Sequence, residues 1–150
     1  MQYTKGSLGR VFTVRLQDGE SIYEAVREIA EKENIHSASV MAVGGIRSGR
    51  VVTGPKNPDG KIVPNIEEFD DARELVGFGT LFQQDGKPSL HFHAAIGRGR
   101  ETLVGCPREG MSVYLVCELV IIEMVGLDAS RLFDPEMGVY LLNIMGSDKQ

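Results

Sequence analysis

Apolar side chains recur with helical spacing in one segment of the chain, between Ser21 and Glu33. The positions that share one helical face carry Ile22, Ala25, Val26, Ile29 and Ala30. Spacings of three and four residues predict an amphipathic helix packed on a sheet. Ser21 and Glu24 have the spacing of a capping box, in which each side chain bonds a free amide of the first turn, and Asn34 is a typical helix stop. The sequence therefore predicts one principal helix.

Most other apolar positions alternate with polar ones, which is typical of half-buried strands. Turn-forming residues separate these runs at 44–45, 55–60 and 85–88, and short turns join antiparallel neighbours. The acidic segment 67–71 is predicted to be a solvated turn, and 128–138 a loop or a short helical turn. The predicted fold class is α+β, a mostly antiparallel sheet with one packed helix. Its strands are expected at 10–16, 38–43, 51–53, 74–82, 91–96, 101–104, 113–124 and 139–144.

The length of 150 residues suits a single domain, which at this size buries about 70% of the surface of the unfolded chain. No internal repeat or linker divides the sequence, so one domain is predicted over residues 1–150. We expect its core over about 9–124, followed by a C-terminal loop and strand over 125–145. A small sheet with one helix leaves a face or edges uncovered, and self-association is a simple way to cover them.

Charge, apolar stretches and cysteine content limit the binding partners and the cellular location that we expect. The net charge of −5 argues against broad affinity for polyanions, although it is compatible with a local basic patch. The polar first residues do not resemble a secretion signal, and the apolar stretch 115–124 is too short to span a bilayer. Two isolated cysteines do not make a disulfide framework. We expect a cytoplasmic protein with reduced thiols and no membrane span.

His91 and His93 form the sharpest candidate site. Alternate residues of a strand face the same side, so this pair can bind one metal ion while Phe92 points into the core. If the chain turns at 98–100, the antiparallel partner of His91 lies near Cys106. Two imidazoles and a thiolate suit Zn²⁺ or another transition metal, and they leave one position for water or substrate. The sequence thus predicts a metal-centred pocket that binds or processes a small molecule, with a bound water as acid or nucleophile.

The same residues also have a plain structural interpretation. His91 and His93 can be polar residues on a solvated strand face, and Cys106 can be a small apolar residue near a turn. A register shift of one residue would turn Cys106 to the opposite face. Glu118 interrupts the apolar run 113–122. It is interpreted as a buried acid, an edge charge that prevents strand pairing, or a carboxylate that hydrogen-bonds a ligand histidine from outside the coordination shell.

A different function is suggested by the segment Gly97-Arg98-Gly99-Arg100. An AT-hook places a similar Arg-Gly-Arg core in a narrow minor groove, but Glu101 stands here where the hook has proline. A tight polar hairpin turn is the simpler interpretation. Arg98, Arg100 and Arg108 would form the basic patch of a DNA-binding or regulatory protein. A scaffold that binds neither metal nor DNA is the third class.

Six short motifs follow one another along the chain. They are GESIYEA at 19–25, ASVMAVGG at 38–45, ELVGFGT at 74–80, LHFHA at 90–94, VGC at 104–106 and CELVI at 117–121. Their order resembles the PPC (plants and prokaryotes conserved) domain family over residues 9–124. This resemblance implies an antiparallel sheet with a packed helix, assembled as a homotrimer, in a stand-alone prokaryotic domain.

The family resemblance also carries two functional expectations. The family is labelled as predicted DNA-binding, and in plant members AT-hooks ahead of the domain contact the DNA; this chain has no such hook. Many prokaryotic members resemble metal proteins with the His-x-His pair and a histidine where Cys106 stands. The resemblance therefore implies metal ligands at His91, His93 and Cys106. Cysteine there either keeps the site, as a zinc ligand, or marks its loss.

Overall fold

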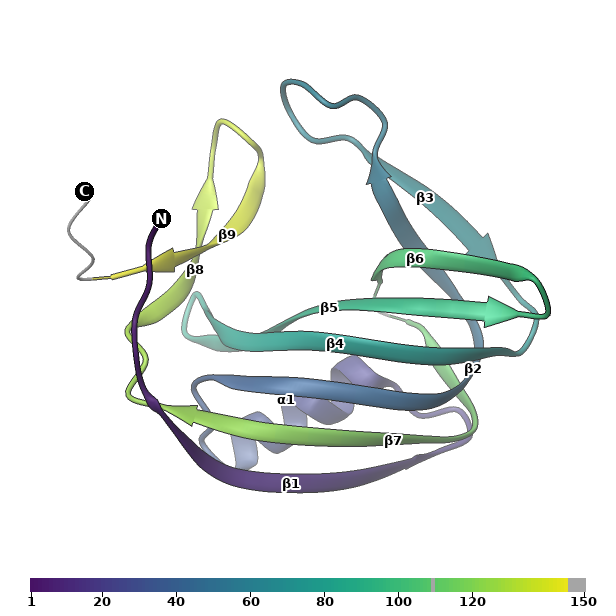
Figure 1. The fold of residues 1–150 in the computed structure, drawn as a ribbon, viewed down its shortest axis with the longest axis horizontal. Helices are drawn as coiled ribbons and strands as arrows, with labels where there is room; N and C mark the ends of the chain where they lie inside the picture. The colour runs from purple at the N-terminus through teal and green to yellow at the C-terminus, as the bar shows by residue number, and fades with distance from the viewer. Residues whose placement is uncertain (109, 146–150) are drawn as a thin grey trace.

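Nine strands and one helix make up the described part of the computed structural model, residues 1–108 and 110–145. The predicted α+β class, a mostly antiparallel sheet with one packed helix, is confirmed (Figure 1). The elements are β1 (Ser7–Gln17), α1 (Ile22–Lys32), β2 (Ala38–Pro55), β3 (Pro64–Phe69), β4 (Arg73–Gln84), β5 (Lys87–Arg98), β6 (Glu101–Pro107), β7 (Ser112–Val125), β8 (Ala129–Asp134) and β9 (Val139–Ile144).

All nine strands belong to one sheet, in the order β1-β7-β2-β6-β5-β4-β8-β9 with β3 beside β2. The first part of β2 also pairs with β4, so that β2, β4, β5 and β6 close a ring. Every ladder is antiparallel except the short contact between β4 and β8. In Figure 1 the β2–β3 and β8–β9 hairpins stand out from the body of the sheet on two sides. Residues of both hairpins line the cavity that contains the candidate site.

Helix α1 packs on one face of the sheet, and Figure 1 shows it behind the strands. Ser21 caps the helix by accepting a hydrogen bond from the Glu24 amide, and Asn34 follows the last turn with a left-handed φ of 54°. Both predicted helix boundaries are thus confirmed to within one residue. The helix buries Ile22, Val26 and Ala30 in the core against the strands. This burial of one helical stripe is what the apolar spacing predicts.

The predicted turn at 44–45 is wrong, because β2 continues through it. Gly44 has φ +152°, and a Cβ atom there would lie 2.5 Å from Cys117 Cα on β7. The β2–β7 register shifts between Gly44 and Gly45, which marks a β-bulge rather than a chain reversal. The strands predicted at 38–43 and 51–53 are therefore two parts of one bent strand. A Gly-Gly pair signals a bulge as readily as a turn.

Two further segments predicted as turn or loop are strands. Glu67 and Glu68 lie in β3, opposite Val51 and Arg50 of β2, and segment 128–138 contains β8 and the turn into β9. Both strands belong to hairpins that project beyond the core. With solvent on much of both faces, they lack the apolar alternation that a half-buried strand needs, so periodicity alone does not reveal them.

The sheet face opposite α1 carries exposed apolar side chains. In register across the strands, Val43 lies opposite Val76 and Met41 opposite Phe78. Val76 is 65% exposed and Phe78 54% exposed. Val104 on β6 continues the row, because Val76 and Val104 both pair with Ala95. We call these five residues (Met41, Val43, Val76, Phe78 and Val104) the open sheet face; no helix covers it among the described residues.

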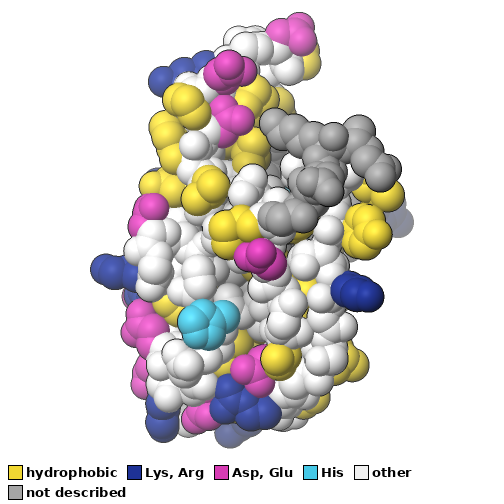
Figure 2. All heavy atoms as spheres, turned by 90° about the vertical axis from the view of Figure 1, so that its left-hand side faces the viewer, with side chains coloured by type: hydrophobic (Ala, Val, Ile, Leu, Met, Phe, Trp, Pro, Cys, Tyr) yellow, Lys and Arg dark blue, Asp and Glu magenta, His cyan; other side chains and the backbone are white. Residues whose placement is uncertain are grey.

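The β8–β9 hairpin is also rich in exposed apolar side chains, including Leu132, Phe133, Leu141 and Leu142. Figure 2 shows hydrophobic side chains in the upper half of the molecule's side that carries this hairpin, with charged side chains both among them and below them. Within the described ranges, none of the helices has the length and apolarity needed to cross a membrane.

Candidate metal centre

His91 and His93 project from β5 on the side opposite the core. Phe92 between them is fully buried, as strand alternation predicts. The two Nε2 atoms are 3.0 Å apart, and the ring centroids are 4.9 Å apart at an interplanar angle of 70°. The predicted convergence of the two imidazoles on one side of the strand is confirmed.

Two glycines of β4 leave the space that the Phe92 ring occupies. A Cβ atom on Gly77 would overlap Phe92 Cζ and lie 2.8 Å from Cε1, and one on Gly79 would lie 2.9 Å from Cδ2. On its other side the Phe92 ring meets Tyr23 of α1 edge-on, with centroids 6.4 Å apart. These contacts anchor Phe92 in the core, so the two histidines on either side of it in sequence point away from the core.

Cys106 enters the site from β6. The β5–β6 ladder pairs Ala94 with Gly105, so its continuation sets Cys106 beside His93, two residues from the predicted pairing with His91. A shift of two residues keeps the side chain on the same face, whereas a shift of one would have reversed it.

Gly105 allows the end of β6 to pass close to β2. A Cβ atom on Gly105 would overlap the Val52 carbonyl oxygen and lie 2.9 Å from its carbon. These are backbone atoms, so no side-chain rotation would relieve the clash. In this close approach Cys106 is the β-sheet partner of Val52. The glycine thus determines where the thiol is placed.

The ligating atoms of His91, His93 and Cys106 all lie within 4.8 Å of one another. Ligands of a tetrahedral zinc ion are about 3.3–3.7 Å apart, given Zn–N and Zn–S bonds of about 2.0–2.3 Å. Small side-chain rotations would bring the observed separations to these values. Two nitrogens and one sulfur form a donor set that zinc accepts, with a fourth position left for another ligand.

Electrostatics at the cluster differ between the ligands. Partial burial lowers the pKa of His91, and the nearby charges of Arg131, His93 and Arg108 lower it further. Burial raises the pKa of the Cys106 thiol, while the charge of Arg108 and the Phe92 backbone N–H act against this rise. A neutral imidazole can bind a metal directly, whereas the thiol must first lose its proton.

The cluster lies in the wall of a cavity of about 940 Å³. Strands β5 and β6 form its floor, and the β2–β3 and β8–β9 hairpins form its sides. Arg108, Arg131 and Tyr140 also line it. A cavity of this size accommodates a small molecule.

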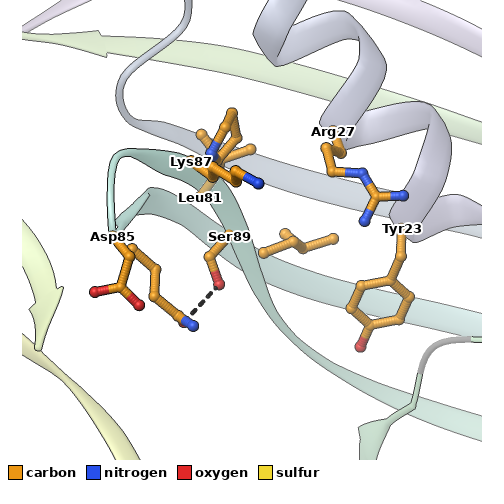
Figure 3. Close-up of a pocket in the computed structure, with 9 residues that line it drawn as sticks. Tyr23, Arg27, Leu81, Asp85, Lys87 and Ser89 are labelled. Carbon is orange, nitrogen blue, oxygen red and sulfur yellow. Dashed lines mark hydrogen bonds between the residues drawn. The ribbon is translucent and has the colours of Figure 1, made fainter. Parts of the chain in front are cut away.

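A second cavity of about 550 Å³ adjoins the first and shares Tyr23 and Ser89 with it. Figure 3 shows Tyr23 and Arg27 extending from α1 toward β5, and Asp85, Lys87 and Ser89 at the β4–β5 turn. Ser89 Oγ donates a hydrogen bond to Gln84 Oε1 at 3.1 Å. The Tyr23 hydroxyl donates to the Pro107 carbonyl oxygen, next to Cys106. Tyr23 therefore connects the helix to the strand that carries the thiol ligand.

Arg131 is a residue of the cavity wall that the sequence reasoning missed. It belongs to β8, is 5% exposed, and its Nη2 donates to the carbonyl oxygen and Oγ1 of Thr80 at 3.0 and 3.2 Å. Its guanidinium carbon lies 5.8 Å from the Phe82 ring centroid. Its segment was predicted to be a loop, so no pattern marked this arginine as buried.

Glu118 is not brought to the histidines. It lies on β7, where it pairs with Val43 of β2 and Arg15 of β1. Its side chain is exposed on the same side of the sheet as the open sheet face. Strand β5 is three strands away, about 14 Å at the usual strand spacing. Within one chain, this placement does not support a hydrogen bond from Glu118 to a ligand histidine.

The three arginines of the DNA-binding alternative do not lie together. Arg98 ends β5 and Arg100 lies in the tight β5–β6 turn, which confirms the predicted hairpin, and Arg98 Nη1 is 3.4 Å from Asp71 Oδ2. Arg108 follows the other end of β6, about 20 Å away along a strand of this length. Arg98 and Arg100 therefore share the turn, and Arg108 belongs to the cavity.

Fold and site together define an α+β domain with a candidate His/His/Cys metal centre beside a cavity. The sequence profile of the Plants and Prokaryotes Conserved (PCC) domain, the family abbreviated PPC above, matches residues 3–125. The chain belongs to this family, as its motifs predict. The β8–β9 hairpin lies beyond the matched range. No curated protein matches the sequence at a significant level.

Several solved structures share the fold. A metal-containing protein from Archaeoglobus fulgidus has 24% identity and a TM-score of 0.83, over 94% of this chain and 98% of that chain. A PPC protein from Pyrococcus horikoshii has 19% identity and a TM-score of 0.77, over 94% and 97%. A protein from Ralstonia eutropha JMP134, for which DNA binding is suggested, has 19% identity and a TM-score of 0.73, over 88% and 90%.

Proposed function

We propose that this PCC-domain protein is a cytoplasmic homotrimer in which His91, His93 and Cys106 hold a zinc ion, or another transition metal, beside a cavity that receives a small molecule. The observation that carries the proposal is the convergence of three ligating atoms within 4.8 Å. The fold neighbour from Archaeoglobus fulgidus, described as metal-containing, adds support. Cysteine in the third position is compatible with zinc, which accepts thiolate and imidazole together.

The chain's own residues would supply the rigidity of such a site. Phe92 fixes the direction of both histidines, and Gly105 fixes the position of the thiol. A metal held there would act as a Lewis acid toward a ligand group in the cavity. Three protein ligands leave one coordination position, and this position would face the cavity, whose wall contains all three ligands.

Elemental analysis by mass spectrometry tests the metal site directly. Untagged protein purified without added metal is expected to carry close to one zinc, or another transition metal, per chain. His91→Ala, His93→Ala and Cys106→Ala should each lose most of it, whereas His36→Ala, which alters the third histidine of the chain, should keep it. Full metal content in the His91→Ala and His93→Ala variants would refute the site.

The open sheet face supports the homotrimer. Monomeric proteins rarely expose contiguous apolar patches larger than a few hundred square ångströms, and Val76 and Phe78 are both more than half exposed here. Light scattering coupled to size exclusion is expected to give three times the chain mass. Val76→Asp should reduce that mass, and Val63→Asp, at an exposed position between β2 and β3, should not. A wild-type monomer would refute the assembly.

DNA binding is the alternative function, supported by the role suggested for the neighbours from Ralstonia eutropha and Bacteroides thetaiotaomicron. It would depend on Arg98 and Arg100 at the β5–β6 turn. Genuine phosphate contacts would give an affinity that falls steeply with salt and weakens in Arg98→Ala and Arg100→Ala. Absence of binding at low salt would reject this alternative.

A further inference from the structure

We propose that Arg131 makes the cavity beside the metal centre an anion-binding pocket, which holds the carboxylate or phosphate group of a small ligand. The position of the ligand's other end, at His91, His93 and Cys106, rests on the proposed metal function. The anion subsite itself rests on Arg131 and on the composition of the cavity wall, and it can be tested without metal.

Among the described residues, Arg131 is a buried cation without a counter-ion. Its side chain forms no ion pair with any carboxylate in residues 1–108 or 110–145, and burial alone lowers its pKa. In the described part of the chain, its hydrogen bonds both go to Thr80 and use Nη2 only, and Nε is buried without a partner. Removing a charge from water is costly unless an opposite charge or a full set of hydrogen bonds replaces the water. An anion in the cavity would supply the opposite charge.

The guanidinium group lies next to the candidate metal ligands. Thr80, which accepts both Arg131 hydrogen bonds, is the direct cross-strand partner of His91. Side chains of such partners are about 5 Å apart on one face of a sheet. Arg131 and His91 both line the large cavity. One small molecule can therefore contact the guanidinium at one end and the metal centre at the other.

The wall of this cavity has a charge opposite to that of the whole protein. The chain carries a net charge of −5, yet the described lining residues include two arginines, Arg108 and Arg131, and no aspartate or glutamate. Neutral donors such as Ser89 and Tyr140 complete the wall. A cavity that concentrates positive charge in an acidic protein attracts anions. Planar guanidinium groups match carboxylate and phosphate oxygens in particular.

Isothermal titration calorimetry with inorganic phosphate and with malonate tests the anion subsite. Wild-type protein is expected to bind at least one of these anions in the millimolar range or tighter. Arg131→Gln should weaken binding by about tenfold or more, as expected for loss of a charge-assisted hydrogen bond. Arg15→Gln, which removes an equal charge at an exposed position of β1, should change it less than about twofold. A preference for phosphate or for malonate identifies which anionic group the pocket takes.

Three results would overturn the anion subsite: no binding by wild-type protein, equal binding by Arg131→Gln, or equal weakening by Arg15→Gln. Because Arg131 is buried, its variant can fail to fold. Arg131→Lys, which keeps the charge but loses the planar fork, then gives the comparison, with binding between that of wild type and none. The wild-type titration remains decisive whatever the variants do.

The same titrations separate this inference from the metal proposal. His91→Ala removes a metal ligand but leaves Arg131 in place, so phosphate binding should persist in that variant if the subsite is real. Zinc bound at full stoichiometry together with no anion binding would refute the subsite and leave the metal centre intact. Anion binding lost in Arg131→Gln, in a protein that never binds zinc, would support the subsite and refute the metal centre.

Discussion

The packing of Phe92 between β4 and α1 can be tested by adding one methyl group. In Gly77→Ala the new Cβ would overlap Phe92 Cζ and come within 2.8 Å of Cε1 and 3.0 Å of the His93 carbonyl oxygen. Overpacking of a well-packed core costs about 1–3 kcal/mol. We expect the upper half of this range, about 2–3 kcal/mol, because Phe92 is fully buried. Its ring also packs against Tyr23, so it has little room to move away from the new methyl group.

A double-mutant cycle shows whether Phe92 is the cause. Phe92→Leu removes the two ring atoms that the new methyl would meet, at a cost of its own of about 1–2 kcal/mol. Independent effects would sum to about 4 kcal/mol, whereas the double variant is expected to lose only about 2 kcal/mol because the leucine leaves room for the methyl group. The predicted coupling is therefore at least about 1 kcal/mol, well above the error of additivity for independent sites.

Urea unfolding followed by circular dichroism measures these free energies, at one protein concentration since oligomerisation shifts apparent stability. In a thermal scan, the Gly77→Ala loss corresponds to roughly 4–12 °C at this chain length. Gly97→Ala on β5 is the control, because its Cβ would meet nothing closer than 3.1 Å and should cost less than about 1 kcal/mol. A neutral Gly77→Ala, or strict additivity with Phe92→Leu, would refute the packing argument.

Three further predictions concern the pH range, the helix start and the thiol ligand. Hydrogen bonds from Arg10 lower the pKa of Glu123 to about 2. The contribution of this carboxylate to stability is therefore complete above the unfolded pKa of about 4.5 and is lost as the pH falls toward 2. In Arg10→Gln the melting temperature should depend less on pH in this range. Ser21→Ala should cost about 0.5–1 kcal/mol in urea unfolding, the low end because its capping bond is 3.4 Å long; no loss would contradict the cap. Gly105→Ala, which clashes with the Val52 backbone, should lower zinc content and cost about 2 kcal/mol or more; unchanged zinc would contradict the argument.

The elements that the sequence predicts well are those whose pattern reflects a single buried face. Helix α1 has one apolar stripe and one capping serine, and both follow from local chemistry. Strand β5 alternates between Phe92 in the core and the two histidines outside. The histidine pair could therefore be identified from period alone, because strand alternation needs no knowledge of the neighbouring strands.

Register and topology needed the structure. The turn length at 98–100 places Cys106 only to within two residues, and the observed pairing differs from the predicted one by two. Because the difference is two residues, Cys106 still lies on the same face of the sheet as the two histidines. The Gly44 bulge could not be told from a turn, since glycine with positive φ is compatible with both. Long-range pairing with β7 decides between them.

Arg131 shows most clearly what local sequence cannot reveal. Nothing near it in the sequence predicts a buried arginine, because its burial depends on contact between β8 and the distant strand β4 at Gln84 and Thr80. The metal ligands lie within the range matched by the family profile, and Arg131 lies beyond it. Metal binding and anion recognition would therefore be carried by separate parts of the chain. If so, changes in the β8–β9 hairpin can alter which ligand is bound while the metal centre stays the same, and the two proposals can succeed or fail independently.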